Sequence, residues 1–156
     1  MQGQRSQPPR ELANLLHDLP QNETWLMSFR NYLTNNQDTM TKAYLLDFVV
    51  DCQALINSPH DPQLRQRLYL TYFDENCLKP VNLANKVLRD QLCETFTSKK
   101  NDDSNFTKDL IQDIRAASRD YKVWKGGLEI CYKDYIASKP AATPIFTATT
   151  VLISLL

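Results

Sequence analysis

LYLTYFDENCLKPVNLA, residues 68–84, is the stretch from which the fold of this chain can be argued. Leucines and aromatic residues recur there at helical spacing and predict one buried helix face: Leu64, Leu68, Tyr69, Tyr72 and Phe73. Asp61-Pro62 suits the start of this helix, because the carboxylate can accept first-turn N–H groups and proline lacks an N–H. Lys79-Pro80 disfavours helix at its first residue. The pattern predicts a helix, a tight corner and a second helix with this apolar stripe: Val81, Leu83, Val87, Leu88, Leu92 and Phe96.

This stretch resembles the central part of the regulator of G-protein signalling homology domain. In that family an IYxxFI-like helix end is followed by KEVNLD, and LYLTYF is followed here by KPVNLA, residues 79–84, at the same spacing. Three further motifs are similar to FxxFL, EFWxxC and YxxF: FRNYL at 29–33, DFVVDC at 47–52 and YKVW at 121–124. The resemblance covers about Trp25 to Ile136, and it implies that Tyr121 and Trp124 anchor the last helices against the core.

The expected fold is all-α, with about eight or nine helices. Four long apolar stripes joined by polar loops favour an antiparallel four-helix bundle: Ala43–Ile56, Gln63–Phe73, Leu83–Phe96 and Phe106–Ser118. Shorter helices are expected at 11–19, ending before Pro20, at 22–33 with Asn22 or Thr24 as the cap, and at 128–136 after a break at Gly126-Gly127. The resemblance alone implies that the terminal helices form a second lobe.

The length of 156 residues fits one domain, which we place at residues 11–138 after a disordered lead-in, 1–10. Residues 139–156 form an uncharged, apolar tail whose run is shorter than the roughly 20 residues that span a bilayer. A frayed tail or a strand-like addition is the first interpretation, and the start of a membrane segment is the alternative. We therefore expect a cytoplasmic, monomeric protein that associates with a membrane only if this tail continues.

Composition excludes several function classes. Lysine plus arginine and aspartate plus glutamate number 18 each, so the balance favours neither nucleic acid nor an anionic membrane as the partner. Cys52, Cys77, Cys93 and Cys131 form no CxxC pair and lie near no histidine cluster, which predicts reduced thiols and no metal site. No nucleophile is paired with a base at a recognisable spacing, and so we expect no catalytic residues and no cofactor.

As the resemblance implies, family members accelerate GTP hydrolysis by Gα subunits by holding the Gα switch loops in their transition-state arrangement. The six positions that match the family's polar Gα contacts differ here. Tyr44 and Leu45 replace a Glu-Asn pair, and Glu94 replaces an asparagine. Arg119, Asp120 and Val123 stand where the family has an acid, a small hydroxyl residue and an arginine. The aromatic residues and leucines of the core remain, whereas the polar residues that contact Gα do not. This combination favours a protein that keeps the family's fold but has lost GTPase activation.

The first hypothesis is therefore a non-catalytic interaction domain, similar to those of A-kinase anchoring proteins and sorting nexins, that binds a Gα subunit, a small GTPase or a kinase-scaffold partner. An exposed patch of Met40, Tyr44 and Leu45 would favour it. The second hypothesis is an active GTPase-activating protein with rebuilt contacts, in which Glu94 supplies the polar group. A small-molecule enzyme is the third.

Overall fold

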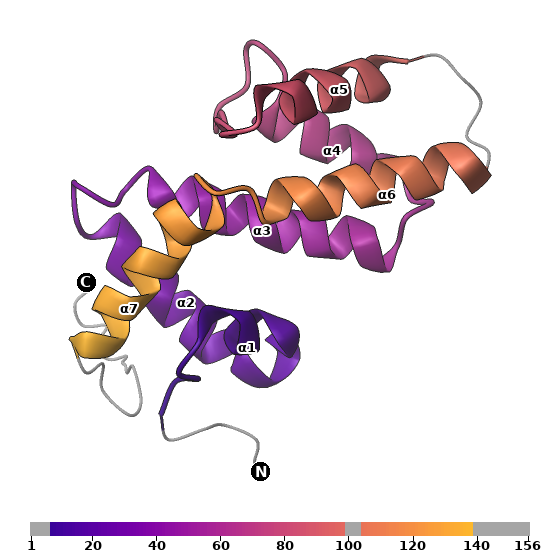
Figure 1. Ribbon diagram of the computed structural model, residues 1–156. Coiled ribbons are helices and arrows are strands. Elements are labelled where there is room, and N and C mark those ends of the chain that lie inside the picture. The colour runs from indigo at the N-terminus through magenta and orange to yellow at the C-terminus, as the bar shows by residue number, and fades with distance from the viewer. Residues whose placement is uncertain (1–6, 99–103, 139–156) are drawn as a thin grey trace. The chain divides into compact units, whose positions relative to one another are not determined.

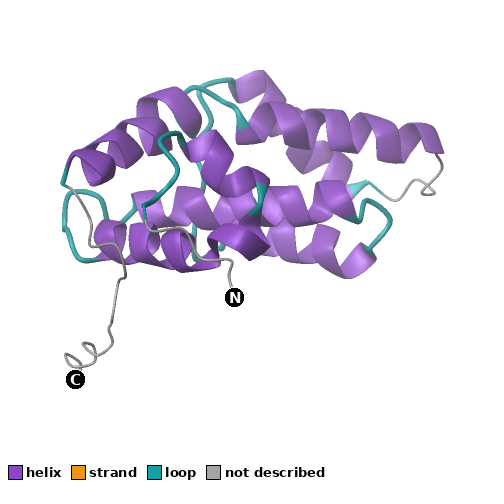
Figure 2. Cartoon of the chain, turned by 90° about the horizontal axis from the view of Figure 1, so that it is seen from below, coloured by secondary structure: helices purple, strands orange, loops and turns teal. Residues whose placement is uncertain are grey.

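The computed structural model describes residues 7–98 and 104–138, and within these ranges the chain is all-α (Figures 1 and 2). The described residues form seven α-helices and one π-helical turn, fewer than the eight or nine helices expected, and contain no strand. None of the described helices has the length and apolarity needed to cross a membrane. The apolar tail, 139–156, most of the lead-in and the charged loop, 99–103, lie outside the described residues.

The chain divides into two compact units, residues 42–128 and the two terminal segments. The 42–128 unit contains four helices and the turn: α3 (Lys42–Asn57), α4 (Pro62–Tyr72), α5 (Lys86–Thr97), α6 (Ser104–Ser118) and η1 (Trp124–Leu128). Helix α3 packs against α4 and α6, and α5 packs against the same two helices. Figure 1 shows α3 and α6 side by side. These are the four segments that the stripes assigned to a bundle.

Phe48 on α3 lies at the centre of this unit. Its side chain is fully buried, and its ring makes edge-on contacts with Tyr72 and Phe73, at centroid distances of 5.2 and 5.6 Å. Leu92 on α5 and Ile114 on α6 are also fully buried. Each such side chain contributes about 1.5–3 kcal/mol by leaving water, which explains why these stripes form one core.

The corner after α4 differs from the prediction of an immediate second helix. Val81 and Leu83 are buried, but they lie in an irregular connector, residues 73–85. Helix α5 begins only at Lys86, because the Asn85 side chain caps it by accepting a hydrogen bond from the Leu88 N–H at 3.0 Å. Val87, which was assigned to the buried stripe, is 75% exposed. The prediction that this helix begins at Leu83 was therefore wrong.

The terminal unit contains α1 (Leu12–His17), α2 (Leu19–Thr34) and α7 (Glu129–Ala137). Helix α2 packs against α1 and α7, and the Phe29 ring meets the Tyr132 ring edge-on at 5.0 Å. Pro9, inside the expected lead-in, is buried, and its carbonyl accepts a hydrogen bond from the Tyr132 hydroxyl.

The start of α2 also differs from the sequence prediction. Pro20 belongs to the first turn of α2, whose N-terminus is capped by Asp18. Asn22 is not the cap. It is buried at a kink in α2, where its amide donates hydrogen bonds to the carbonyl groups of Asn14 and Leu15. These bonds connect α2 to α1, which a pattern of local spacing does not reveal.

Candidate functional site

Asp120, just beyond the end of α6, organises one end of the 42–128 unit. Its side chain is 7% exposed, and its carboxylate accepts three backbone hydrogen bonds. The N–H groups of Ala84 and Lys122 donate to Oδ1 at 2.7 and 3.1 Å, and that of Asn85 donates to Oδ2 at 3.0 Å. Hydrogen bonds to an ionised acceptor are about twice as strong as neutral ones. Asp120 therefore fixes the connector immediately before α5.

A second contact attaches the connector to α3. The Lys79 ammonium donates to Asp47 Oδ2 at 2.9 Å, and both groups are partly buried. The start of α3, the connector and the corner after α6 thus meet at one end of the unit. We call this region, residues 42–47, 73–85 and 119–128, the Asp120 end.

Gly126 and Gly127 were expected to break the helical structure of the chain. Instead, they lie within the π-helical turn η1. The Gly126 N–H donates to the Tyr121 carbonyl at 2.7 Å, and the Leu128 N–H donates to the Val123 carbonyl at 2.9 Å. A Cβ atom at Gly127 would clash with the Lys122 carbonyl and would lie 3.2 Å from the Leu45 side chain. Glycine is required there because the backbone and α3 approach so closely. Such turns occur frequently at functional sites.

The structure separates the six sequence-predicted positions into two groups. Val123 is fully buried and Asp120 nearly so, while Tyr44 and Leu45 are half-buried. These four side chains serve the fold at least in part. Of the patch that would have favoured an interaction domain, Met40 is 45% exposed but Tyr44 and Leu45 are half-buried, which weakens that argument. Arg119 and Glu94 are exposed.

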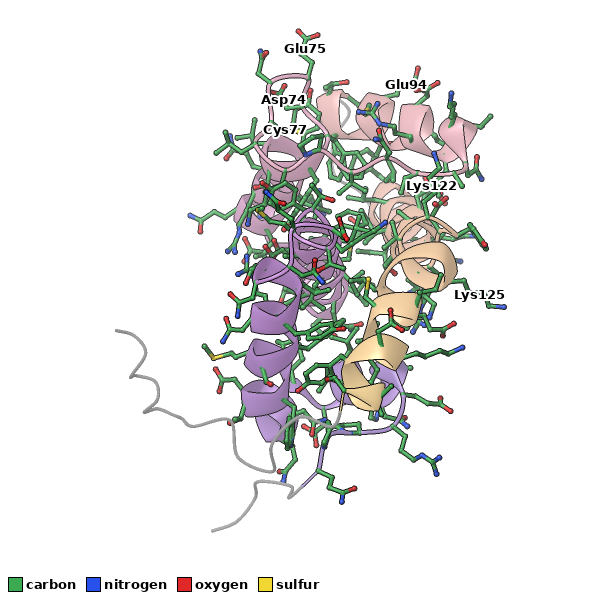
Figure 3. All side chains as sticks on the ribbon, turned by 90° about the vertical axis from the view of Figure 1, so that its left-hand side faces the viewer. Asp74, Glu75, Cys77, Glu94, Lys122 and Lys125 are labelled. Carbon is green, nitrogen blue, oxygen red and sulfur yellow. The ribbon has the colours of Figure 1, made fainter. Side chains whose placement is uncertain are left out.

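Glu94 does not belong to the Asp120 end. It lines a groove of about 880 Å³ between α5 and α6, together with Phe106, Asp109 and Asp113. Burial and the neighbouring Asp109 carboxylate raise the pKa of Asp113. Figure 3 shows Glu94 on α5 and Lys122 on the corner after α6.

Sequence reasoning missed three apolar residues that the Asp120 end and the adjoining turn of α5 expose. Leu78 in the connector is 87% exposed, Val87 on α5 is 75% exposed and Tyr121 is 65% exposed. Tyr121 and Trp124 were both expected to anchor the last helices against the core, but only Trp124 is buried. A sequence signal existed for Val87: Asn85 is a preferred cap, and Leu88 and Leu92, four residues apart, already define the buried face.

The described residues contain no group of three or more His, Cys, Asp or Glu side chains that could hold a metal ion. None of the four cysteines, all of which lie in the described residues, forms a disulfide bond in the structure. What the Asp120 end offers is a fixed surface with exposed apolar side chains. Comparison of the chain with protein-family models, curated proteins and solved structures finds no match.

Proposed function

We propose that this chain is a protein-interaction domain of the regulator of G-protein signalling homology type, which binds a Gα subunit or a scaffold partner through the Asp120 end. The observation that carries the proposal is a fixed end that, together with the adjoining turn of α5, has three largely exposed apolar side chains: Leu78, Val87 and Tyr121. Large apolar groups held on a fixed surface are typical of protein interfaces. The chain itself is not a hydrolase in this proposal.

The helix arrangement supports the family assignment. The resemblance implies a four-helix bundle and a lobe of terminal helices, and the two units have these compositions. The KPVNLA segment and the YKVW segment, which carry much of the resemblance, both lie at the Asp120 end. Ala84, the last residue of the first segment, and the following Asn85 donate hydrogen bonds to Asp120, which immediately precedes the second segment.

The burial of the contact positions supports the loss of GTPase activation. Stabilising the Gα transition state requires polar groups directed at the switch loops. Val123 is fully buried, and both carboxylate oxygens of Asp120 already accept backbone hydrogen bonds. Leu45 is apolar and packs near Gly127.

The test is a pull-down with a panel of purified Gα subunits in the GDP form and in the aluminium fluoride form. We expect binding to at least one form, and we expect Leu78→Asp and Val87→Asp to abolish it. Met27→Asp on α2, at a residue that is 60% exposed, is the matched control and should bind as the wild type does. Equal binding by all variants would place the interface elsewhere, and absence of binding to every Gα would leave only the scaffold partner.

Single-turnover GTP hydrolysis by the same Gα subunits distinguishes the second candidate. Glu94 favours that candidate because its carboxylate is exposed and lines the groove between α5 and α6. We expect no acceleration. An acceleration of about tenfold, equivalent to about 1.4 kcal/mol of barrier, would establish GTPase activation instead, and its loss in Glu94→Ala would assign the polar group.

A further inference from the structure

The Tyr121 ring is exposed and yet packs against the backbone. A Cβ atom at Gly126 would lie 2.6 Å from Cε2 and 3.1 Å from Cδ2 of this ring, so the ring rests directly against the glycine backbone. The side chain is nevertheless 65% exposed. An aromatic ring that already packs against the backbone loses less conformational entropy when a partner covers it than a ring without such a contact. Tyr121 therefore has the properties of a binding anchor.

Three exposed cationic residues lie within four positions of Tyr121 in the sequence: Arg119, Lys122 and Lys125. Within the described residues none of them forms an ion pair. Asp120, the one acidic residue within residues 119–125, is buried and accepts three backbone hydrogen bonds. Although the whole chain has no net charge, residues 119–125 contain three cations and one carboxylate, which leaves a net charge of +2 in this segment.

The position of at least one of these cationic groups is set by a contact within the fold. The Arg119 guanidinium lies 4.2 Å from the centroid of the Trp124 ring, a distance at which cation–π attraction orients it. The Lys125 side chain extends outward from the ribbon in Figure 3. We call Arg119, Tyr121, Lys122 and Lys125 the basic corner.

We propose that the basic corner binds an acidic segment of the partner protein, with Tyr121 as the apolar anchor and the three cations as the carboxylate-binding groups. This inference rests on the proposed function, because it names the chemistry of the partner at the same end. Charge complementarity decides the class of partner: exposed cations favour aspartate- and glutamate-rich segments and disfavour basic ones. An anionic membrane is the less suitable surface, since a ring that packs against the backbone offers little apolar depth for insertion.

The first test is a titration of the isotope-labelled chain with an Asp/Glu-rich peptide that contains one leucine, followed by NMR. We expect chemical-shift changes at Tyr121, Lys122 and Gly126 that decrease as salt is added, and none with a Lys-rich peptide of equal length. Lys122→Glu with Lys125→Glu should weaken peptide binding by about tenfold or more, while Lys133→Glu on α7 should not. Absence of shifts with the acidic peptide, or shifts only with phosphatidylserine vesicles, would overturn the proposal.

The second test separates this inference from the proposed function. Tyr121→Ala should weaken peptide binding roughly thirtyfold, as expected for an anchor residue. Gly126→Ala, which displaces the ring and keeps every charge, should weaken it in the same direction. If the Gα pull-down succeeds but these variants and the charge reversals bind as the wild type does, the basic corner is not the contact and the proposed function stands. If no Gα binds, the peptide titration still decides the inference.

Discussion

Asp120 connects the end of α6 to the connector by hydrogen bonds that span 35 and 36 residues of sequence. Replacing it with alanine leaves three backbone N–H groups without their acceptor in a part-buried place. We expect Asp120→Ala to lower the free energy of unfolding by about 2–4 kcal/mol, measured by urea denaturation. Asp90→Ala removes an exposed acid from α5 and should change stability by less than about 0.5 kcal/mol. A loss below about 1 kcal/mol for Asp120→Ala would contradict the role assigned to this carboxylate.

For Asp113 we expect the opposite effect, a substitution that raises the free energy of unfolding. Burial and the Asp109 charge raise its pKa, so the folded protein releases this proton less readily than the unfolded chain does. Stability contributed by this site therefore falls as the pH rises through the carboxyl range and does not recover at neutral pH. We expect Asp113→Asn to stabilise the protein at pH 7 by about 0.2–0.5 kcal/mol, as relief of like charges four residues apart on a helix does.

The check on Asp113 is the pH dependence of that difference. In acid, where both Asp113 and its unfolded counterpart are protonated, the variant and the wild type should have equal free energies of unfolding. A stabilisation that is the same in acid and at neutral pH would show that the charge is not its cause.

At the scale of elements, the turn η1 predicts different outcomes for two adjacent glycines. Alanine at Gly127 would clash with the Lys122 backbone carbonyl, which cannot move without opening the turn. Alanine at Gly126 would meet only the exposed Tyr121 ring, which can swing away. We expect Gly127→Ala to cost about 2 kcal/mol or more and Gly126→Ala less than about 1 kcal/mol, by thermal or urea unfolding. The reverse order would mean that the turn is not built as described.

The sequence predicted α3 and α4 to within one residue at each end, because local signals determine them. Asp61 caps α4 with hydrogen bonds from the N–H groups of Gln63 and Leu64, as Asp61-Pro62 indicated. The sequence prediction was wrong where contacts with residues far along the chain determine the local structure. Val81 and Leu83 show helical spacing, but their segment is held by Asp120, and an apolar stripe does not reveal that a far carboxylate accepts its backbone N–H groups. For the same reason Val123 was assigned to the partner surface although it packs in the core.

The sequence motifs indicate the region of the proposed interface but not its exposed residues. Motif spacing directed attention to KPVNLA and YKVW, which the fold brings together. The exposed side chains there are Leu78, Tyr121 and the neighbouring Val87 rather than Tyr44 and Leu45. Exposure depends on where α5 begins and on how η1 turns, and both depend on contacts that cross the unit.

At the scale of the whole molecule, each of the two units contains one buried cysteine. Cys52 is fully buried in the 42–128 unit, and Cys131 is 6% exposed in the terminal unit. Cys77 in the connector and Cys93 on α5 are half-buried. Because the thiolate is the reactive form, both exposure and pKa control the rate of thiol modification. Burial, reinforced by the Asp51 charge, raises the pKa of Cys52.

We therefore expect a thiol reagent at neutral pH to modify Cys77 and Cys93 first, with Cys52 and Cys131 protected until their unit opens. Mass spectrometry of peptides from timed samples, repeated over a urea series, measures the four rates in one experiment. The protection of Cys52 then reports opening of the 42–128 unit, and that of Cys131 reports opening of the terminal unit. Core variants provide the control: Leu92→Ala should expose Cys52 at lower urea, since it removes a fully buried side chain at a cost of about 2–5 kcal/mol. Modification of Cys52 as fast as Cys77 in native buffer would contradict the packing of α3.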